Sequence, residues 1–357
     1  MEALGVNARF WSGRRVLLTG VTGFKGSWLA LWLRKLGADV TGYALPPPTA
    51  PSLFQTARVN DGIRWIDADV RDLDRLKSAV RECAPEVVFH LAAQSLVRPS
   101  YEAPVDTFAT NVMGTVNVLE ALRDHEATRA VVVITSDKCY ENREWVWPYR
   151  ESDSLGGRDP YSSSKACTEI VTSSYYQSFF KANHVGVATA RAGNVIGGGD
   201  WARDRLVPDV AAAFAAGESA LVRNPGSVRP WQHVLEPLLG YLLLAERLAG
   251  DDKGFSEGWN FGPDPLAVRP VSELVTSLCA LWGDGARWHT VDVPQPHEAQ
   301  LLALDASKAR ARLRWAPRLR LDEALAWTAR WYKAFHRGVD VRSISLQQLD
   351  DYQGVTT

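Results

Sequence analysis

Short apolar runs that alternate with longer amphipathic segments through the first half of the chain constrain its fold more than any other feature. The short runs are typical of buried parallel strands, and the longer segments are typical of helices that cover a sheet. The expected strands span residues 15–19, 39–43, 64–67, 87–91, 130–134 and 186–190, and the expected helices span residues 26–36, 73–83, 111–123 and 163–182. Because strands separated by helices form βαβ units, we expect an α/β fold built on a doubly wound parallel sheet.

The texture of the sequence changes after about residue 193, where clusters of glycine and proline separate shorter elements. These clusters lie at residues 197–199, 224–226 and 262–265. Glycine and proline in such density end helices and strands and mark turns. We therefore predict a Rossmann-type domain over residues 1–192 and a smaller α/β domain over residues 193–357, with some segments of the second returning to the core of the first.

The bulk composition excludes several functional classes. The 357 residues carry a formal net charge of −1, so no basic field points to nucleic acid or to an anionic membrane surface. No apolar run reaches the roughly 20 residues that a membrane-spanning helix needs, and the first residues lack the pattern of a secretory signal. The four cysteines are scattered without metal-ligand spacing, which indicates reduced thiols and no metal site. We expect a cytoplasmic enzyme that binds neither nucleic acid nor membrane.

A glycine-rich turn, TGVTGFKG, directly follows the first expected strand and opens the first expected helix. Its glycines Gly20, Gly23 and Gly26 let the backbone turn tightly and approach a pyrophosphate, whose charge then meets the helix N-terminus. The turn therefore predicts a dinucleotide site. The second strand ends without the Asp or Glu that normally accepts a hydrogen bond from the adenosine ribose, and without an arginine for a 2′-phosphate. These residues alone therefore leave NAD and NADP both open.

The second chemical signal is the pair Tyr161 and Lys165 in the motif YSSSK. On a helix the two side chains face the same way, about one turn apart. A nearby ammonium stabilises phenolate and lowers the pKa of the tyrosine, which produces a general base for a hydroxyl proton. Ser136, at the end of the strand 130–134, is placed to orient the substrate oxygen. Together these residues predict hydride transfer at a carbon that bears a hydroxyl.

With the glycine turn, Ser136 and YSSSK in this order, the chain resembles the extended short-chain dehydrogenase/reductase superfamily, in particular its nucleotide-sugar dehydratases. The resemblance implies NAD as the cofactor and Ser136, Tyr161 and Lys165 as catalytic residues. It implies cofactor contacts at Gly20, Gly23, Phe24, Lys25, Gly26, Asp69, Val70, Leu91, Ala92, Ala93, Gln94, Asn111, Tyr161 and Lys165. Among these residues, Asn111 has a mainly structural role in the superfamily, at a kink in its helix.

The segment TSDKCYEN places Asp137 and Lys138 directly after Ser136. Oxidation alone does not need them, whereas a 4,6-dehydratase needs an acid and a base to eliminate water across C5 and C6. Most dehydratases of this kind have Asp-Glu here, and the Asp-Lys pair resembles the CDP-glucose 4,6-dehydratases over about residues 10–332. The motifs that carry this resemblance are FHLAAQSLVR at 89–98, SDKCY at 136–140, YSSSK at 161–165, AGNVIGGGDW at 192–201, PHEA at 296–299 and the triproline at 46–48.

This resemblance implies dehydration of CDP-D-glucose to CDP-4-dehydro-6-deoxy-D-glucose, with hydride taken from C4 and returned to C6. Asp137 would protonate the leaving C6 oxygen, and Lys138 would be the C5 base or an electrostatic helper. One alternative is that Lys138 only forms a salt bridge with Asp137 or another acid. Another is a nucleotide-sugar 4-epimerase or reductase of the same fold. A non-catalytic dinucleotide sensor is disfavoured, because it has no use for an activated phenol.

The nucleotide end of the substrate is assigned mainly by resemblance. The implied contacts are Ser95, Arg98, Asn194, Arg203, Arg205, Arg229, Trp231 and His233, and Glu298 is either a further contact or an ordinary solvated loop residue. Arginine suits a pyrophosphate because its fork of donors matches phosphate oxygens. No residue selects cytosine by its own chemistry, so CDP rests on the resemblance. The apolar faces of segments 105–123 and 161–182, with the resemblance, imply a homodimer, or a tetramer made of two dimers.

Overall fold

A seven-stranded sheet forms the centre of the computed structural model, which describes residues 5–250, 253–264, 267–290 and 302–354. The strand order is β10-β6-β5-β4-β1-β2-β3, and every neighbouring pair is parallel. The strands are β1 (Arg15–Thr19), β2 (Asp39–Ala44), β3 (Arg64–Asp67), β4 (Val87–His90), β5 (Ala130–Ile134), β6 (Gly186–Ala192) and β10 (Gly258–Phe261). The order reverses between β1 and β4, the kind of switch point where α/β sheets bind ligands. The expected doubly wound parallel sheet is confirmed.

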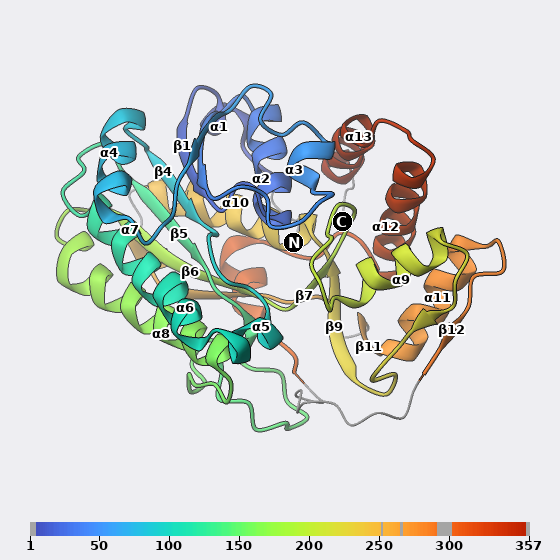
Figure 1. The fold of residues 1–357 in the computed structure, drawn as a ribbon. Helices are drawn as coiled ribbons and strands as arrows, with labels where there is room; N and C mark the ends of the chain where they lie inside the picture. Colours follow the sequence, from blue (N-terminus) through green and yellow to red (C-terminus); the bar gives the residue numbers. More distant parts are fainter. Residues whose placement is uncertain (1–4, 251–252, 265–266, 291–301, 355–357) are drawn as a thin grey trace.

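Helices cover both faces of this sheet (Figure 1). Side chains alternate along β5, so Val131 and Val133 share a core with α4 and α7, whereas Val132 and Ile134 share a core with α2 and α10. The helices of the first half and α10 are α1 (Ala8–Trp11), α2 (Phe24–Lys35), α3 (Leu53–Thr56), α4 (Leu73–Cys83), α5 (Val97–Glu102), α6 (Pro104–Phe108), α7 (Gly114–Leu122), α8 (Pro160–Tyr175) and α10 (Leu235–Ala249). Both faces of β5 are therefore buried, as its uninterrupted apolar run predicts.

Two crossover helices begin earlier than the sequence pattern predicts, and each starts at a proline. α6 begins at Pro104 and continues through a π-helical turn at Ala109–Met113 into α7, and α8 begins at Pro160. Proline suits the first helical position because the amide hydrogen that it lacks would be unpaired there. Asp159 caps α8 by accepting a hydrogen bond from the Ser162 amide at 2.9 Å. The motif YSSSK consequently lies wholly on α8, which continues into a second π-helical turn.

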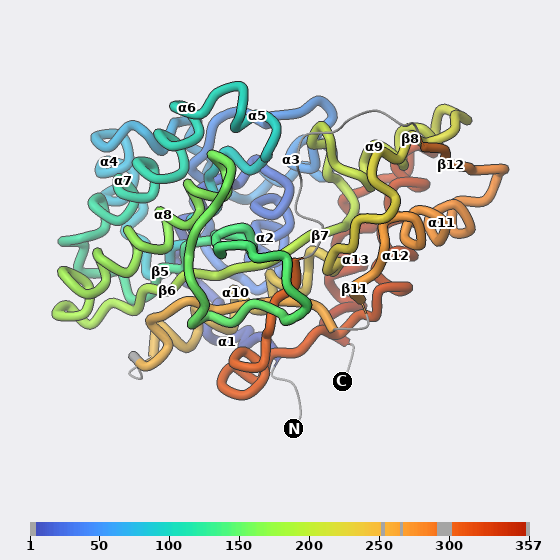
Figure 2. The backbone as a smooth tube through the Cα atoms, turned by 90° about the horizontal axis from the view of Figure 1, so that it is seen from below, coloured from blue at the N-terminus to red at the C-terminus, as the bar shows by residue number. Residues whose placement is uncertain are grey.

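The second half of the chain forms a smaller unit beside the sheet, visible on the right of Figure 2. It contains a three-stranded sheet in the order β11-β9-β7 and a two-stranded pair, β12-β8. Its elements are β7 (Asn194–Ile196), α9 (Leu206–Ala215), β8 (Ala220–Leu221), β9 (Val228–His233), β11 (Val268–Pro270), α11 (Val271–Trp282), β12 (Trp288–His289) and α12 (Leu321–His336). Because α10 and β10 return to the first sheet, the chain passes between the two units more than once. The domain boundary after residue 192 stays a prediction.

The last helix, α13 (Val341–Gly354), joins the end of the chain to the first βα unit. The rings of Tyr352 and Trp32 lie 5.7 Å apart, and Lys35 pairs with Asp350 at 2.7 Å. The Tyr352 hydroxyl also donates to Glu236 of α10 at 2.7 Å. α13 is therefore part of the packed core of the molecule. Within the described ranges, no helix has the length and apolar character that crossing a bilayer requires.

Candidate active site

A cavity of about 750 Å³ lies at the carboxyl ends of the central strands, between the two units. Most of the residues that the sequence singled out meet there although they come from distant segments. The predicted site residues that line the cavity are Gly20, Gly23, Phe24, Lys25, Gly26, Asp69, Val70, Leu91, Ala92, Ala93, Gln94, Ser95, Arg98, Ser136, Asp137, Lys138, Tyr161, Lys165, Asn194, Arg203, Arg205, Arg229 and Trp231. Folding thus brings the glycine turn, the strand-end turn and the arginines together in one site.

The glycine turn forms one end of the cavity. Gly20 has a φ of +72°, and a Cβ there would lie 2.6 Å from the Ala92 amide nitrogen. A Cβ on Gly26 would lie 2.1 Å from the carbonyl oxygen of Gly20, so neither position accepts a side chain. Gly23 is different, because its Cβ would meet only the Gly20 oxygen at 3.4 Å. Gly23 caps the N-terminus of α2 and borders the cavity, a cradle that fits a dinucleotide pyrophosphate.

Asp69 and Arg71 border the expected adenosine end of the cavity. Arg71 donates to Asp69 at 2.6 Å and to Asp106 at 2.5 Å. The hydrogen bond from Arg71 is the main cause that holds the pKa of Asp69 below its ordinary value. The Tyr43 hydroxyl donates to the Asp69 carbonyl oxygen at 2.9 Å, which fixes the loop after β3 to β2. Arg71 is a charged residue at this end of the cavity that was not among the predicted site residues.

Tyr161 and Lys165 are both buried on α8 and face the cavity. Burial raises the pKa of Tyr161 to about 12, against a lowering hydrogen bond from Ser136. The expected net lowering of the tyrosine pKa by Lys165 is therefore wrong for this structure, because desolvation of phenolate outweighs the favourable contacts. Burial also lowers the pKa of Lys165 to about 8, and its Nζ donates to the Ile134 carbonyl oxygen at 3.2 Å.

The strand-end turn after β5 is a 3₁₀ turn over Asp137–Cys139. Ser136 caps it by accepting from the Lys138 amide at 3.2 Å and donates from its hydroxyl to Asp137 Oδ1 at 3.0 Å. Asp137 is 3% exposed, and its Oδ2 has no hydrogen-bond partner within the described part of the chain. Oδ2 lies where a Cβ on Gly193 would approach within 2.9 Å. A buried carboxylate oxygen that borders a polar cavity is a candidate for a ligand contact.

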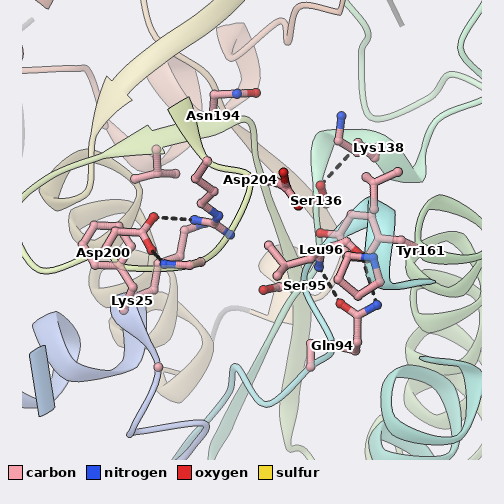
Figure 3. Close-up of a pocket in the computed structure, with 18 of the residues that line it drawn as sticks. Lys25, Gln94, Ser95, Leu96, Ser136, Lys138, Tyr161, Asn194, Asp200 and Asp204 are labelled. Carbon is pink, nitrogen blue, oxygen red and sulfur yellow. Dashed lines mark hydrogen bonds and ion pairs between the residues drawn. The ribbon is translucent and has the colours of Figure 1, made fainter. Parts of the chain in front are cut away.

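Lys138 is half-buried and borders the same cavity, and Figure 3 shows it beside Ser136 and Tyr161. No ion pair links Lys138 to Asp137, two residues that the structure fully describes. The alternative in which Lys138 only neutralises Asp137 therefore has no support in this geometry. Lys138 could take part in proton transfer or stabilise negative charge on a bound sugar.

Lys25 has a lowered pKa, a property that its place in the glycine turn did not predict. Burial lowers the pKa of Lys25 to about 7, with a further lowering by Arg205 and an opposite effect of Asp137. Lys165 and Asp200 act on it as well, so this lysine lies within electrostatic reach of both the strand-end turn and the arginines. Figure 3 shows Lys25 and Asp200 on the opposite side of the site from Tyr161. A lysine with this pKa changes charge near neutral pH.

The arginines at the expected nucleotide end are partly held by carboxylates. Arg205 pairs with Asp200 at 2.9 Å, and Asp204 pairs with Arg98 at 3.4 Å and with Arg223 at 2.6 Å. Asp200, Asp204 and Arg223 were not among the predicted site residues. For the two aspartates, the available signal was their position beside Arg203 and Arg205 after the glycine cluster. Arg223 had no such signal, because only the fold brings it to this loop.

Two predicted site residues lie outside the cavity lining, and a third lies outside the described residues. His233 is fully buried between Trp28 and Trp327, at ring distances of 6.3 and 5.7 Å, and burial lowers its pKa to about 3. Its placement supports no substrate contact, because the two indole rings enclose the imidazole in the core. Asn111 is also buried, and its Nδ2 donates to the Gln94 carbonyl oxygen at 2.9 Å. Glu298 lies outside the described residues.

Asn111 therefore acts on the site through the backbone of Gln94 rather than by lining the cavity. Its Oδ1 accepts from the Gln94 amide at 2.8 Å, and its Nδ2 also donates to Ser164 of α8 at 2.8 Å. It stands in the π-helical turn between α6 and α7. The structural role that the resemblance implied agrees with this placement, and the direct cofactor contact of Asn111 stays a prediction.

Comparisons with known proteins bear on the same features. The family model described as GDP-mannose 4,6 dehydratase matches residues 17–328. A CDP-glucose 4,6-dehydratase of Salmonella typhimurium is 52% identical over 99% of this chain and 99% of its own length. In structure, the chain resembles a dTDP-glucose 4,6-dehydratase of Bacillus anthracis in complex with NAD, at 20% identity and a TM-score of 0.75 over 92% of this chain and 100% of the other. A UDP-glucose 4-epimerase of Thermotoga maritima with UDP-glucose has 22% identity and a TM-score of 0.77 over 90% and 99% of the two chains.

Proposed function

This chain belongs to the GDP-mannose 4,6 dehydratase family, and from that premise we propose that it dehydrates CDP-D-glucose to CDP-4-dehydro-6-deoxy-D-glucose. The observation that carries this proposal is the placement of Asp137 and Lys138 beside Ser136, Tyr161 and Lys165 in one cavity. The 52% identity to a CDP-glucose 4,6-dehydratase over nearly the full length of both chains supports the choice of substrate. The enzyme is a hydro-lyase that uses NAD and needs no second substrate.

The residues of the glycine turn would hold NAD, which would supply a hydride acceptor for C4 and return the hydride to C6, so the cofactor would be unchanged after each turnover. The residues of the chain handle the protons. Ser136 orients the C4 oxygen, and Tyr161 accepts its proton while the hydride leaves. Lys165 lies one helical turn after Tyr161 on α8, where its ammonium donates to the Ile134 carbonyl oxygen and supplies positive charge to the site. Because burial holds the pKa of Tyr161 at about 12, the phenolate needs positive charge nearby to form.

The elimination of water is assigned to the strand-end turn. Oxidation at C4 acidifies the C5 hydrogen, so a base can remove it while the C6–oxygen bond breaks. Asp137 donates the proton that leaves with the C6 oxygen as water, and we assign removal of the C5 proton, or stabilisation of the resulting negative charge, to Lys138. The unpartnered Asp137 Oδ2 supports a direct role for this carboxyl group.

The glycine turn and the arginines divide the rest of the cavity between the two nucleotides. We assign Gly23 and the N-terminus of α2 to the pyrophosphate of NAD, and Arg205 and Arg229 to the diphosphate of the sugar nucleotide. Asn194, Trp231 and Arg98 complete the second group. Arginine at this end suits a diphosphate because its planar donors match phosphate oxygens.

The rival activity is 4-epimerisation, because epimerases share the fold. A 4-epimerase needs no acid to expel a C6 hydroxyl, so Asp137 and Lys138 favour the dehydratase. The test is incubation with CDP-, dTDP-, GDP- and UDP-glucose and NAD, followed by base treatment, which turns 4-keto-6-deoxy products into enones that are measured by their absorbance. Product from CDP-glucose at a rate at least about tenfold above the others supports the proposal, since about 1.4 kcal/mol of selectivity suffices for that ratio.

We also propose a homodimer, or a tetramer made of two dimers. Large apolar side chains are exposed along α6, α8 and the π-helical turns that follow these two helices. They are Val105 at 81%, Phe108 at 37%, Met113 at 51%, Ile170 at 58% and Phe179 at 37% exposure. An exposed apolar face of this kind is typical of a subunit interface. For location we propose the cytoplasm, which is supported by four unpaired thiols in Cys83, Cys139, Cys167 and Cys279.

A further inference from the structure

A buried ion pair lies directly beneath the strand-end turn, between Glu169 of α8 and Arg191 of β6. Both side chains are about 4% exposed. Arg191 donates through Nε at 2.9 Å to one carboxylate oxygen and through Nη2 at 2.7 Å to the other. A buried ion pair is a poor source of stability, because desolvation of two charges offsets their attraction. Its presence beside a catalytic site suggests that it serves alignment.

The beginning of the strand-end turn is attached to this pair through Thr135. The Thr135 hydroxyl donates to Glu169 Oε1 at 2.5 Å, and its amide donates to the Ala190 carbonyl oxygen at 3.0 Å. Thr189 donates to the other oxygen of Glu169 at 2.6 Å. The carboxylate thus accepts four hydrogen bonds and has a single orientation. Thr135 immediately precedes Ser136, so this orientation determines where the turn starts.

The end of the turn is attached to the same pair through Tyr140. The Tyr140 hydroxyl accepts from Arg191 Nη1 at 2.6 Å and donates to Asn260 Oδ1 at 2.8 Å. The side chain is 1% exposed, and burial raises the pKa of its phenol, so the group remains a donor. Asn260 in turn donates to the carbonyl oxygens of Tyr149 and Asp305, at 2.9 and 3.1 Å.

The same ion pair also contacts α8, the helix that carries the oxidation residues Tyr161 and Lys165. Tyr161, Lys165 and Glu169 succeed one another at four-residue intervals, so they follow one face of α8. Lys165 donates to the carbonyl oxygen of Ile134, the last residue of β5, at 3.2 Å. Glu169 therefore links the position of the helix to both ends of the turn.

We infer that Glu169, Arg191, Thr135 and Tyr140 form a positioning network that aligns the oxidation residues of α8 with the elimination residues Asp137 and Lys138. Within it, Tyr140 is a positioning residue that serves the elimination step. This inference rests on the proposed dehydratase function. The Tyr140 hydroxyl holds only the far end of the turn, whereas Ser136 and Lys165 are held by Thr135 and by the Ile134 carbonyl oxygen. Loss of that hydroxyl should therefore displace Asp137 and Lys138 more than the groups that oxidise C4.

The test is a single-turnover experiment with CDP-glucose and the NAD-loaded enzyme, followed by absorbance of NADH. In the elimination step, the C5 proton passes to a base and the C6–oxygen bond breaks as the oxygen gains a proton. Only then can hydride return to C6 and consume the NADH. For Tyr140→Phe we expect formation of NADH within about threefold of the wild-type rate and its decay slowed about tenfold or more, since misplacement by a fraction of an ångström is costly. NADH should therefore accumulate, as it should in Asp137→Asn.

Tyr149→Phe is the matched control, because Tyr149 is also buried and its ring stacks on Tyr140 at 5.1 Å. Its hydroxyl contacts the Arg143 amide and Asn142 and does not reach the ion pair, so it should leave the NADH transient unchanged. Thr135→Val, at the other end of the turn, should disturb both steps. Equal slowing of NADH formation and decay in Tyr140→Phe, or no change in either, would overturn the inference. If Tyr140→Phe has a lowered melting temperature, Asn260→Ser gives a second test, with accumulation of NADH again expected.

The wild-type enzyme separates failure of this inference from failure of the proposed function. If the wild type forms no 4-keto-6-deoxy product from CDP-glucose, the function is wrong. If it does and the transient in Tyr140→Phe is normal, the function stands and the positioning role of Tyr140 is refuted.

Discussion

At the scale of single residues, burial decides the charge of the groups that face the cavity. It raises the pKa of Tyr161 to about 12 and lowers the pKa of Lys165 to about 8 and of Lys25 to about 7. A desolvated phenol resists ionisation and a desolvated ammonium loses its proton more readily. The protonation of Tyr161, Lys165 and Lys25 should therefore change when a charged ligand binds in the cavity.

Replacement of Tyr161 by phenylalanine should remove the acid–base group while leaving the cavity almost unchanged in shape. We expect kcat to fall by roughly 10²–10⁴-fold, the usual contribution of a positioned acid–base group. The dissociation constant of CDP should change little, because we assign binding of the diphosphate to the arginines and not to the Tyr161 hydroxyl. Steady-state kinetics and calorimetry measure the two quantities, and a normal kcat would remove Tyr161 from the mechanism.

Lys25 predicts that binding of an anion is coupled to proton uptake. Near pH 7.5 the group with a pKa of about 7 is mostly neutral, and a bound diphosphate raises that pKa and restores the ammonium. Calorimetric titration with CDP in two buffers of different ionisation enthalpy should show uptake of about half a proton by the wild type. The uptake should be smaller in Lys25→Met. An identical proton count in both proteins would show that Lys25 does not sense the ligand.

At the scale of elements, the turn from β1 to α2 joins two requirements that different glycines satisfy. Gly20 and Gly26 have no room for a side chain because backbone approaches backbone there. Gly23 has an ordinary φ of −78° and has room, and it borders the cavity. Gly20 and Gly26 are therefore needed to build the turn, and Gly23 keeps the helix N-terminus open to a phosphate.

Alanine at Gly26 and at Gly23 should separate these two roles. Gly26→Ala should lower the melting temperature by several degrees, because its Cβ would lie 2.1 Å from the Gly20 oxygen. Gly23→Ala should retain the wild-type melting temperature and weaken NADH binding about tenfold or more, since its methyl group occupies the approach to the helix N-terminus. Thermal denaturation and NADH fluorescence titration test the pair. Equal stability of both variants would contradict the steric argument.

Glu236 of α10 makes the attachment of the last helix sensitive to pH. Its carboxylate accepts from the Leu319 amide at 2.8 Å and from the Tyr352 hydroxyl at 2.7 Å, yet burial raises its pKa to about 7. An acid whose pKa is raised in the folded state gives full stability below its unfolded pKa of 4.5, and this stability is lost as the pH rises through about 7.

The free energy of unfolding of the wild type should therefore fall as the pH rises from 4.5 through about 7, and Glu236→Gln should abolish this fall. We expect the variant to match the wild type near pH 5 and to exceed it near pH 8 by an amount on the order of 3 kcal/mol. Urea denaturation at both pH values gives the difference. A variant that is less stable than the wild type by the same amount at both pH values would show that the hydrogen bonds, and not the charge, matter.

At the scale of the whole molecule, two units enclose the cavity and one outer face remains apolar. That face comprises exposed side chains of α6 and α8, including Val105 at 81% and Ile170 at 58% exposure. α6 and α8 lie along one side of the molecule in Figure 1. The proposed dimer would cover this face without closing the cavity, which lies between the units.

Glutamate at Val105 together with glutamate at Ile170 should produce monomers, because two charges would be buried in each copy of the interface. Light scattering coupled to gel filtration should report half the wild-type mass. Val339 is the matched control, because it is 50% exposed and lies between α12 and α13. A monomeric wild type, or a double variant that keeps the wild-type mass, would contradict the proposed interface.

Much of the fold could be predicted because its signals are local. Apolar runs such as 130–134 identify buried strands, and the glycine spacing after β1 identifies a turn that only one type of fold uses in this context. The helix starts at Pro104 and Pro160 were missed because proline reads as a break unless its position relative to the first turn is known. The protonation of Tyr161 was also missed, since it depends on burial.

The amino-acid sequence alone was enough to predict the order of the parallel βαβ units, the chemistry of YSSSK and the acid–lysine pair that distinguishes this strand-end turn. These depend on residues within one turn of helix or one strand of each other. The three-dimensional fold was needed to show that His233 belongs to the core, that Arg223 pairs with Asp204, and that Glu169 and Arg191 connect Thr135 to Tyr140. Such contacts link residues far apart along the chain, and spacing in the sequence does not encode the packing that brings them together.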